Sequence, residues 1–264
     1  MRRRLDAELV RRGQARSREQ AQELIAAGHV HVDGVLAHKA ASQVEQGSAI
    51  TVDEGGSHYV SRGAHKLLGA LEAFPDLQVS GRRVLDAGAS TGGFTQVLLE
   101  RGAAEVAAVD VGYGQLAWVL QTDPRVRVID RTNVRTLEPK DLPFAADLVV
   151  ADLSFISLSL VLPSLIACAT PEADFLLMVK PQFEVGREAV GDGVVRDPAL
   201  RASAVLAVAA AARELGLAVH GVVASPLPGP SGNVEVFVWL RRGDNASWPD
   251  VVAAVDRAVQ EGPP

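Results

Sequence analysis

The sequence predicts an α/β fold, with a doubly wound sheet of seven strands preceded by a small α+β domain. From Arg82 onward, apolar runs typical of buried strands alternate with helical segments. The first sixty residues instead show two helical patterns followed by short alternating segments. The chain has 264 residues, 48% of them hydrophobic, which is enough for one large and one small domain.

Composition excludes several classes of protein. Cys168 is the single cysteine, so the chain has neither an internal disulfide framework nor a cysteine-based zinc cluster. The histidines His29, His31 and His38 lack the spacing of metal ligands, and we expect no metal site. No stretch approaches eighteen apolar residues and the first residues are charged, which argues against a membrane span or a signal peptide. We therefore expect a cytoplasmic protein.

The amino-terminal segment predicts a compact module. Its first helix ends at Gly13, and Ser17 to Gln20 has the pattern of a capping box that opens a second helix. The alternating run 29–32 leads into Asp33-Gly34, which favours a tight hairpin turn, and 48–52 supplies a partner strand. A polar, glycine-rich linker at 53–58 follows. We place the domain boundary there, with one domain at 1–60 and the other at 61–264.

Charge is distributed unevenly along the chain. The formal net charge is −6, but the first twenty residues hold seven arginines against three acidic residues. A local basic patch on an acidic protein indicates contact with an anionic partner such as nucleic acid. The alternative is a solvated charged face without a partner.

The large domain is predicted to contain seven strands, each ending near a helix or a turn. The last two are joined by 226–233 without a crossover helix, so we expect them to pair antiparallel. The predicted strands are 84–89, 105–111, 126–131, 146–154, 173–180, 218–224 and 234–240.

A glycine-rich turn follows the first of these strands. Its pattern, Asp-x-Gly-x-x-x-Gly-Gly over 86–93, fits neither the dinucleotide fingerprint nor the phosphate-binding loop, because Ser90 replaces a glycine and no lysine follows Gly93. Asp110 ends the next strand, where a carboxylate can accept hydrogen bonds from two ribose hydroxyls. The two features together predict a nucleoside cofactor, whereas the turn alone could be a plain connection.

Charged residues also end the later strands. Asp130, Asp152 and Lys180 all fall at carboxyl ends, where open α/β sheets bind ligands. A lysine after so apolar a strand should be partly desolvated, which favours the neutral amine and suits a base. Glu235 lies near the start of the last strand, while Lys66, on an earlier helix, is by itself typical of a surface lysine. For any single residue, an ion pair at the sheet rim is the commoner explanation.

These motifs resemble known families. The glycine turn resembles motif I of S-adenosylmethionine-dependent methyltransferases, which have a Rossmann-like sheet, and so implies S-adenosylmethionine as cofactor. The run from Arg4 to Gly34 resembles the RNA-binding module of a small-subunit ribosomal protein, which lays Arg4, Arg16 and Arg18 against RNA phosphates. The resemblance and the strand ends together give the predicted cofactor-binding residues Asp86, Gly88, Ser90, Gly92, Gly93, Phe94, Asp110 and Asp130.

The order Lys66, Asp152, Lys180, Glu235 resembles the tetrad of the FtsJ-like RNA ribose 2′-O-methyltransferases. With the strings Ser-Arg-Gly-Ala-His-Lys, Ala-Asp-Leu-Ser-Phe-Ile-Ser and Val-Lys-Pro-Gln-Phe-Glu-Val-Gly, the chain resembles the TlyA family throughout its length. That resemblance implies 2′-O-methylation of cytidine in ribosomal RNA of both subunits. Lys180 would be the base, Asp152 and Glu235 would orient it, and Lys66 would hold the nucleotide.

Other functions remain to be weighed. The TlyA family is also labelled haemolysin, which would imply a membrane-active protein, but the long apolar helix at 200–217 is typical of a sheet-covering helix. A non-catalytic RNA-binding protein is a further alternative, against which the complete tetrad argues. Base methylation needs a cysteine nucleophile or a proline-rich turn, and Cys168 falls in an apolar helix, while 152–155 lacks the prolines.

Overall fold

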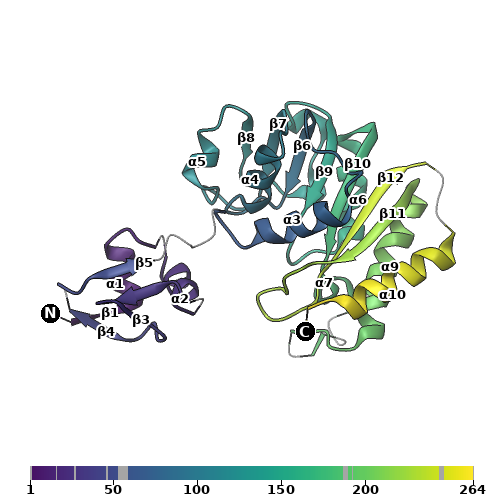
Figure 1. Ribbon diagram of the computed structural model, residues 1–264. Coiled ribbons are helices and arrows are strands. Elements are labelled where there is room, and N and C mark those ends of the chain that lie inside the picture. The colour runs from purple at the N-terminus through teal and green to yellow at the C-terminus, as the bar shows by residue number, and fades with distance from the viewer. Residues whose placement is uncertain are drawn as a thin grey trace. The chain divides into compact units, whose positions relative to one another are not determined.

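The computed structural model contains two compact units, Met1–His58 and Tyr59–Pro264 (Figure 1). Each unit has its own hydrophobic core. The structure describes residues 2–15, 17–26, 28–45, 47–52, 59–186, 190–191, 193–243 and 247–263.

The amino-terminal unit packs two helices on two small sheets. Leu5, Leu9, Ile25 and Val30 are almost fully buried at its centre. One sheet pairs β1 with β4 and the other has the order β3-β2-β5. The elements are β1 (Arg2–Arg4), α1 (Leu5–Arg11), α2 (Arg18–Ala26), β2 (Val30–Val32), β3 (Val35–Leu36), β4 (Gln43–Glu45) and β5 (Ile50–Val52).

Local sequence signals explain most of this unit. The amide of Gln20 donates to Ser17 Oγ at 3.1 Å, as the capping pattern predicts. Asp33 and Gly34 have φ of 50° and 80°, so both central turn residues are left-handed, as a tight hairpin requires. The turn joins β2 to β3, while the expected partner strand β5 pairs with β2 on its other side. Strands β1, β3 and β4 were not expected, because two or three residues are too few to show a period.

The second unit is built on a seven-stranded sheet of order β11-β12-β10-β9-β6-β7-β8. Six strands run in the same direction and β12 runs antiparallel to its neighbours β10 and β11, which confirms the predicted fold. The strands are β6 (Arg83–Ala87), β7 (Glu105–Val109), β8 (Val126–Ile129), β9 (Ala146–Ala151), β10 (Ala169–Val179), β11 (Leu217–Ala224) and β12 (Val236–Arg242).

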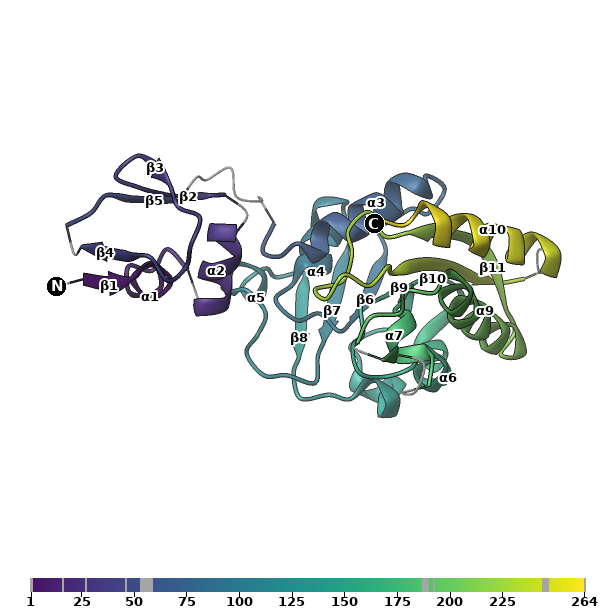
Figure 2. The ribbon, with the colours of Figure 1, turned by 90° about the horizontal axis from the view of Figure 1, so that it is seen from below.

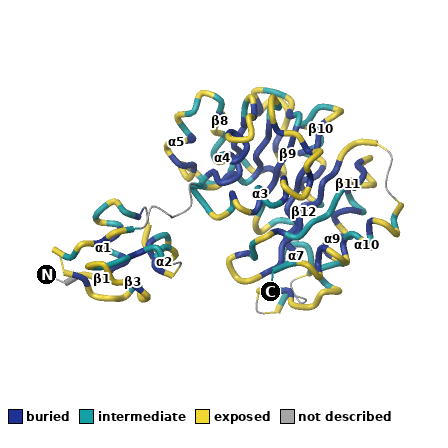
Figure 3. Tube along the Cα trace, viewed as in Figure 1, coloured by how far each residue is buried: buried dark blue, intermediate teal, exposed yellow. Residues whose placement is uncertain are grey.

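Helices cover both faces of this sheet (Figures 2 and 3). Successive residues of a strand point to opposite faces, so Leu85 joins the core under α6, α9 and α10, whereas Val84 joins the core under α3, α4 and α5. The helices are α3 (Gly63–Ala73), α4 (Gly93–Glu100), α5 (Trp118–Gln121), α6 (Leu158–Ala167), α7 (Pro181–Glu184), α9 (Pro198–Glu214) and α10 (Trp248–Glu261), with two 3-10 turns at Val134–Thr136 and Pro139–Asp141.

Several strands end earlier than the sequence predicts. The expected strands 84–89, 105–111, 126–131 and 146–154 end at Ala87, Val109, Ile129 and Ala151. Isolated backbone hydrogen bonds continue beyond these points, such as Asp152 N–H donating to the Ala87 carbonyl at 3.1 Å. Asp110 and Asp152 therefore stand on the first loop residues after their strands, where side chains are free to face a ligand. The last strand, expected to begin at 234, begins at Val236, so Glu235 lies one residue before it.

Candidate active site

The turn between β6 and α4 is a tight backbone cradle. Gly88 and Gly92 have φ of 86° and 100°, in the left-handed region that favours glycine. A Cβ at Gly88 would lie 2.6 Å from the backbone oxygen of Asp152, and one at Gly92 would lie 2.3 Å from the Leu120 side chain. Ser90 is also left-handed, with φ of 48°. Glycine at 88 and 92 thus lets the turn lie against the loop after β9 and against helix α5.

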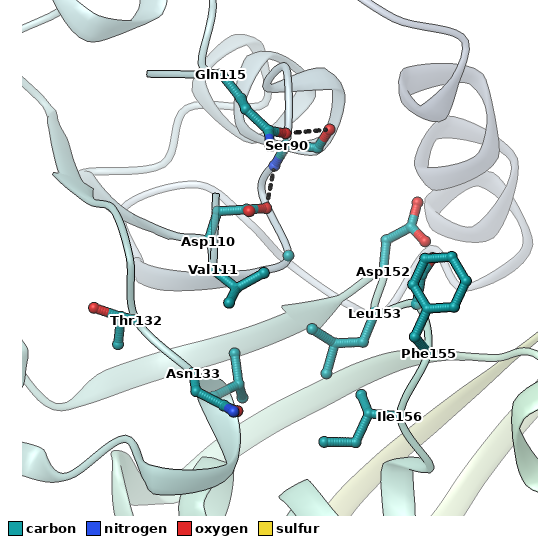
Figure 4. Close-up of a pocket in the computed structure, with 13 residues that line it drawn as sticks. Ser90, Asp110, Val111, Gln115, Thr132, Asn133, Asp152, Leu153, Phe155 and Ile156 are labelled. Atoms are coloured by element: carbon teal, nitrogen blue, oxygen red, sulfur yellow. Dashed lines mark hydrogen bonds between the residues drawn. The ribbon is translucent and has the colours of Figure 1, made fainter. Parts of the chain in front are cut away.

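Asp110 is fixed against this turn by two backbone hydrogen bonds. The amide of Ser90 donates to Oδ2 at 2.8 Å (Figure 4), and the amide of Gly112 donates to Oδ1 at 2.7 Å. Each carboxylate oxygen can accept a second hydrogen bond, so the group retains capacity for a ligand. The two bonds set the direction of the carboxylate before any ligand arrives.

A cavity of about 450 Å³ opens beside Asp110. Its size lies in the range of small-molecule sites. Among the predicted cofactor residues it includes Gly88, Ser90 and Asp110, and Asp152 also borders it. The sequence reasoning missed the other residues, which follow strand ends without a charge to mark them. The lining consists of Gly88, Ser90, Asp110, Val111, Gln115, Thr132, Asn133, Val134, Asp152, Leu153, Ser154, Phe155 and Ile156.

The other five predicted cofactor residues do not line this cavity. They are Asp86, Gly92, Gly93, Phe94 and Asp130. Asp130 Oδ2 accepts a hydrogen bond from the Gly114 amide at 2.9 Å, which anchors the loop after β7. Phe94 is buried and stacks on Phe237 with 6.1 Å between ring centroids. A Cβ on Gly93 would lie 2.2 Å from Ser61 Oγ, so this glycine permits close packing near the start of α3.

Asp86 is fully buried beneath the turn. Thr95 Oγ1 donates to its Oδ2 at 2.6 Å, while its Oδ1 has no hydrogen-bond partner among the described residues. Burial raises the pKa of Asp86 from 3.8 to about 7, because the charged carboxylate loses its hydration. Near neutral pH the Asp86 carboxyl group is therefore partly protonated.

The four residues of the predicted tetrad form two ion pairs. Lys180 Nζ lies 2.5 Å from Asp152 Oδ1 and donates to Ser154 Oγ at 2.9 Å. Lys66 Nζ lies 2.5 Å from Glu235 Oε2. Lys66 is only 4% exposed, so the surface position that its helix alone suggested is wrong. Helix α3 turns this lysine toward the sheet, where a fully buried carboxylate compensates its charge.

A second cavity, of about 370 Å³, lies on the other side of Ser154 and Phe155, which border both cavities. It contains Lys180 and Glu235, one member of each ion pair. Three of the four residues thus border a cavity, Asp152 the first and Lys180 and Glu235 the second, whereas Lys66 lines neither. Each cavity is large enough for a small molecule. The second lining consists of Ser154, Phe155, Lys180, Gln182, Phe183, Val190, Gly193, Pro230, Ser231, Asn233 and Glu235.

Cys168 lies away from both cavities. The predicted helix ends at Ala167, and Cys168 caps it just before β10 begins at Ala169, so its expected place inside the helix is wrong by one residue. Its thiol is 1% exposed, and burial raises the pKa of Cys168 to about 11. At neutral pH it is therefore protonated and a poor nucleophile.

Two arginines of the amino-terminal unit share one buried acid. Arg4 Nη2 and Arg18 Nη2 lie 3.0 and 2.9 Å from Asp6 Oδ2. The hydrogen bond from Arg4, and to a smaller extent the one from Arg18, holds the pKa of Asp6 well below its usual range. Both arginine side chains remain about half exposed, so a single buried carboxylate orients two cations toward solvent. Arg16, predicted alongside them, lies outside the described residues.

Six strands of one direction with a single antiparallel strand, and a glycine turn after the first of them, are the architecture of a methyltransferase. The chain belongs to the FtsJ-like methyltransferase family, which matches residues 59–242. Residues 3–50 match the S4 domain.

Curated relatives and solved structures agree with this family. The chain is 62% identical to the 16S/23S rRNA (cytidine-2′-O)-methyltransferase TlyA of Mycobacterium tuberculosis, over 98% of each chain. It is 34% identical to Hemolysin A of Brachyspira hyodysenteriae, over 88% of this chain and 97% of that one. A solved hemolysin structure from Streptococcus thermophilus superimposes with a TM-score of 0.78 at 37% identity, covering 98% of this chain and 96% of the other. In the described part of this chain, no helix is both long and apolar enough to span a membrane.

Proposed function

We propose that the protein transfers a methyl group from S-adenosylmethionine to the ribose 2′-hydroxyl of cytidine in ribosomal RNA of the small and large subunits. The observation that carries this proposal is the pair of ion pairs Lys180–Asp152 and Lys66–Glu235, of which Asp152 borders the first cavity and Lys180 and Glu235 the second. The name of the 62% identical relative gives the same reaction for that protein.

The residues of the first cavity fit S-adenosylmethionine. Asp110 offers acceptor positions for ribose hydroxyls, and Val111, Leu153 and Ile156 supply apolar surface for an adenine ring. Gly88 lets the turn lie against the loop that follows β9, because a Cβ there would clash with the Asp152 backbone oxygen. This turn borders the first cavity and is the proposed contact of the methionine part. The buried Asp86 can balance an incoming ammonium charge by releasing its proton.

The second cavity is then the place of the acceptor nucleoside. When bound, S-adenosylmethionine supplies a methyl group on a sulfonium that a ribose oxygen can attack. Lys180 Nζ takes the proton from the 2′-hydroxyl, held in place by Asp152 and Ser154. The pair of Lys66 and Glu235 positions the nucleotide on the opposite side.

We assign RNA docking to residues 1–60 and catalysis to residues 61–264. Arg4, Arg16 and Arg18 are the residues proposed to contact phosphates, and Asp6 orients two of them. Phosphate contacts supply affinity without sequence readout, so the catalytic part must choose the nucleotide. Because the proposed substrate is ribosomal RNA, we place the protein in the cytoplasm and regard haemolysin as a secondary label.

Replacing Asp110 by alanine should weaken S-adenosylmethionine binding about ten- to a hundredfold. The change removes charge-assisted hydrogen bonds to the ribose, which are together worth about 1.5–3 kcal/mol. Titration calorimetry measures this affinity directly. The control is Asp256→Ala on α10, an exposed acid outside both cavities, which should leave the affinity unchanged. Equal affinities for the Asp110 variant and the wild type would remove Asp110 from the cofactor site.

Deleting residues 1–58 should abolish methylation of ribosomal subunits while preserving cofactor binding. The remaining unit has its own core on both faces of the sheet, so it should fold. Calorimetry with S-adenosylmethionine checks the fold, and label transfer to purified subunits checks activity. Undiminished activity of the truncated protein on subunits would contradict the assignment of RNA docking to this segment.

A further inference from the structure

The second cavity contains a polar group that the mechanism above does not use. Gln182 lies on α7, two residues after Lys180, and its side chain lines the cavity. Its Oε1 atom is buried and accepts no hydrogen bond from the described part of the chain. A buried acceptor without a donor is unfavourable, and a ligand that brings a donor removes this penalty.

A second unpartnered acceptor lies in the same cavity. Glu235 Oε1 is also buried and accepts no hydrogen bond from any described residue, although Oε2 of the same carboxylate pairs with Lys66. Two residues that line this cavity therefore each carry a buried acceptor without a donor. A nucleoside supplies donors of two kinds, its ribose hydroxyls and the amino group of its base. With the 2′-hydroxyl at Lys180, the ribose lies beside Glu235, and the base extends to the remaining wall.

We propose that Gln182 contacts the Watson–Crick edge of the target base and selects cytidine over uridine. This inference rests on the proposed function. Cytosine carries an N4 amino donor beside the N3 acceptor, which match Oε1 and Nε2 of one carboxamide. Uracil in the same position places its O4 acceptor against Oε1 and its N3–H against the amide N–H, so both contacts become repulsive.

Because Oε1 is buried, the carboxamide of Gln182 cannot reverse its orientation to suit uracil without a cost. Turning the carboxamide over to suit uracil would place an NH2 group, with two donors, where the single acceptor now lies. The O4 atom of uracil could accept from one of these hydrogens at most in that geometry, and the other would remain buried without a partner. Cytidine satisfies the observed arrangement without that cost.

The test compares two substrates for the full-length protein. Ribosomal subunits are prepared with the methylated cytidine, first mapped with the wild type, or with uridine at that position. The wild type should prefer cytidine. Gln182→Leu should lower kcat/KM on the cytidine substrate about ten- to a hundredfold and bring the ratio of the two substrates close to one, because one well-placed base contact is worth about 1–3 kcal/mol. Affinity for S-adenosylmethionine should not change.

Gln182→Glu separates acceptor from donor. This variant keeps an oxygen for the N4 amine but loses the donor to N3, so it should be slower than the wild type on cytidine yet retain preference over uridine better than Gln182→Leu. Gln78→Leu, at an exposed amide outside both cavities, is the matched control and should behave as the wild type. Calorimetry with S-adenosylmethionine identifies any variant that has not folded.

Failure of this inference is distinct from failure of the proposed function. A Gln182→Leu enzyme with the wild-type ratio of cytidine to uridine would overturn the role of Gln182, as would a wild type that methylates both bases equally. In either case ribose methylation itself would stand. A wild type that methylates no ribose on either substrate would instead overturn the proposed function.

Discussion

Lys180→Arg and Lys180→Met should each lower the single-turnover rate of methylation by about two to four orders of magnitude. Arginine keeps the positive charge but does not deprotonate in proteins, whereas methionine keeps the apolar stem and loses both charge and basicity. If basicity is what matters, both variants fail alike. Rapid-quench measurement with enzyme in excess over RNA isolates the chemical step. Cofactor affinity should stay close to that of the wild type.

The Lys180 experiment has an internal comparison and a clear contrary outcome. Lys140→Met, at an exposed lysine paired with Glu138, should leave the rate unchanged. A Lys180→Arg enzyme with a near-normal rate would make Lys180 an electrostatic positioner and move the base to water or Asp152.

Asp86→Asn should change the pH dependence of stability. In the folded protein Asp86 keeps its proton up to about pH 7, while in the unfolded chain the carboxyl ionises near its usual pKa of 3.8. Between these values the folded state binds more protons, so the contribution of Asp86 to the free energy of unfolding falls as pH rises. Between pH 3.8 and pH 7 the contribution of Asp86 to the free energy of unfolding falls by about 4 kcal/mol.

Asparagine does not titrate, so the free energy of unfolding of Asp86→Asn minus that of the wild type should increase between pH 4 and pH 8. The substitution also has a cost that does not depend on pH, because an amide NH2 can replace the unpartnered Oδ1. The change of the difference with pH therefore reports only the ionisation of Asp86. Urea unfolding at a series of pH values measures it. A difference that stays constant with pH would mean that Asp86 ionises normally in the folded protein.

Much of the fold follows from sequence periodicity, and the exceptions have physical causes. Long apolar strands such as 173–180 and the two-residue turn at Asp33-Gly34 carry strong local signals. Strand ends were placed too late because apolar character continues through Val111 and Leu153 after the hydrogen-bonded ladder stops. Pairing depends on the neighbouring strand, which a single segment does not reveal.

The site was predictable where a charge marks a strand end. Asp110, Asp152 and Lys180 are such residues, and the structure brings them to the borders of two adjoining cavities. Lys66 carried no local sign of burial, because its partner Glu235 is 169 positions away. Gln182 was missed because nothing in the local sequence shows that an amide in a short helix lines a cavity.

The central claim is that this chain methylates the ribose of cytidine in ribosomal RNA. The most direct measurement incubates the full-length protein with methyl-labelled S-adenosylmethionine and separated small and large subunits, then digests the RNA to nucleosides and separates them. We expect label in 2′-O-methylcytidine, absent when Lys180→Met replaces the wild type. Label in a base-methylated cytidine, or no label in RNA from either subunit, would contradict it.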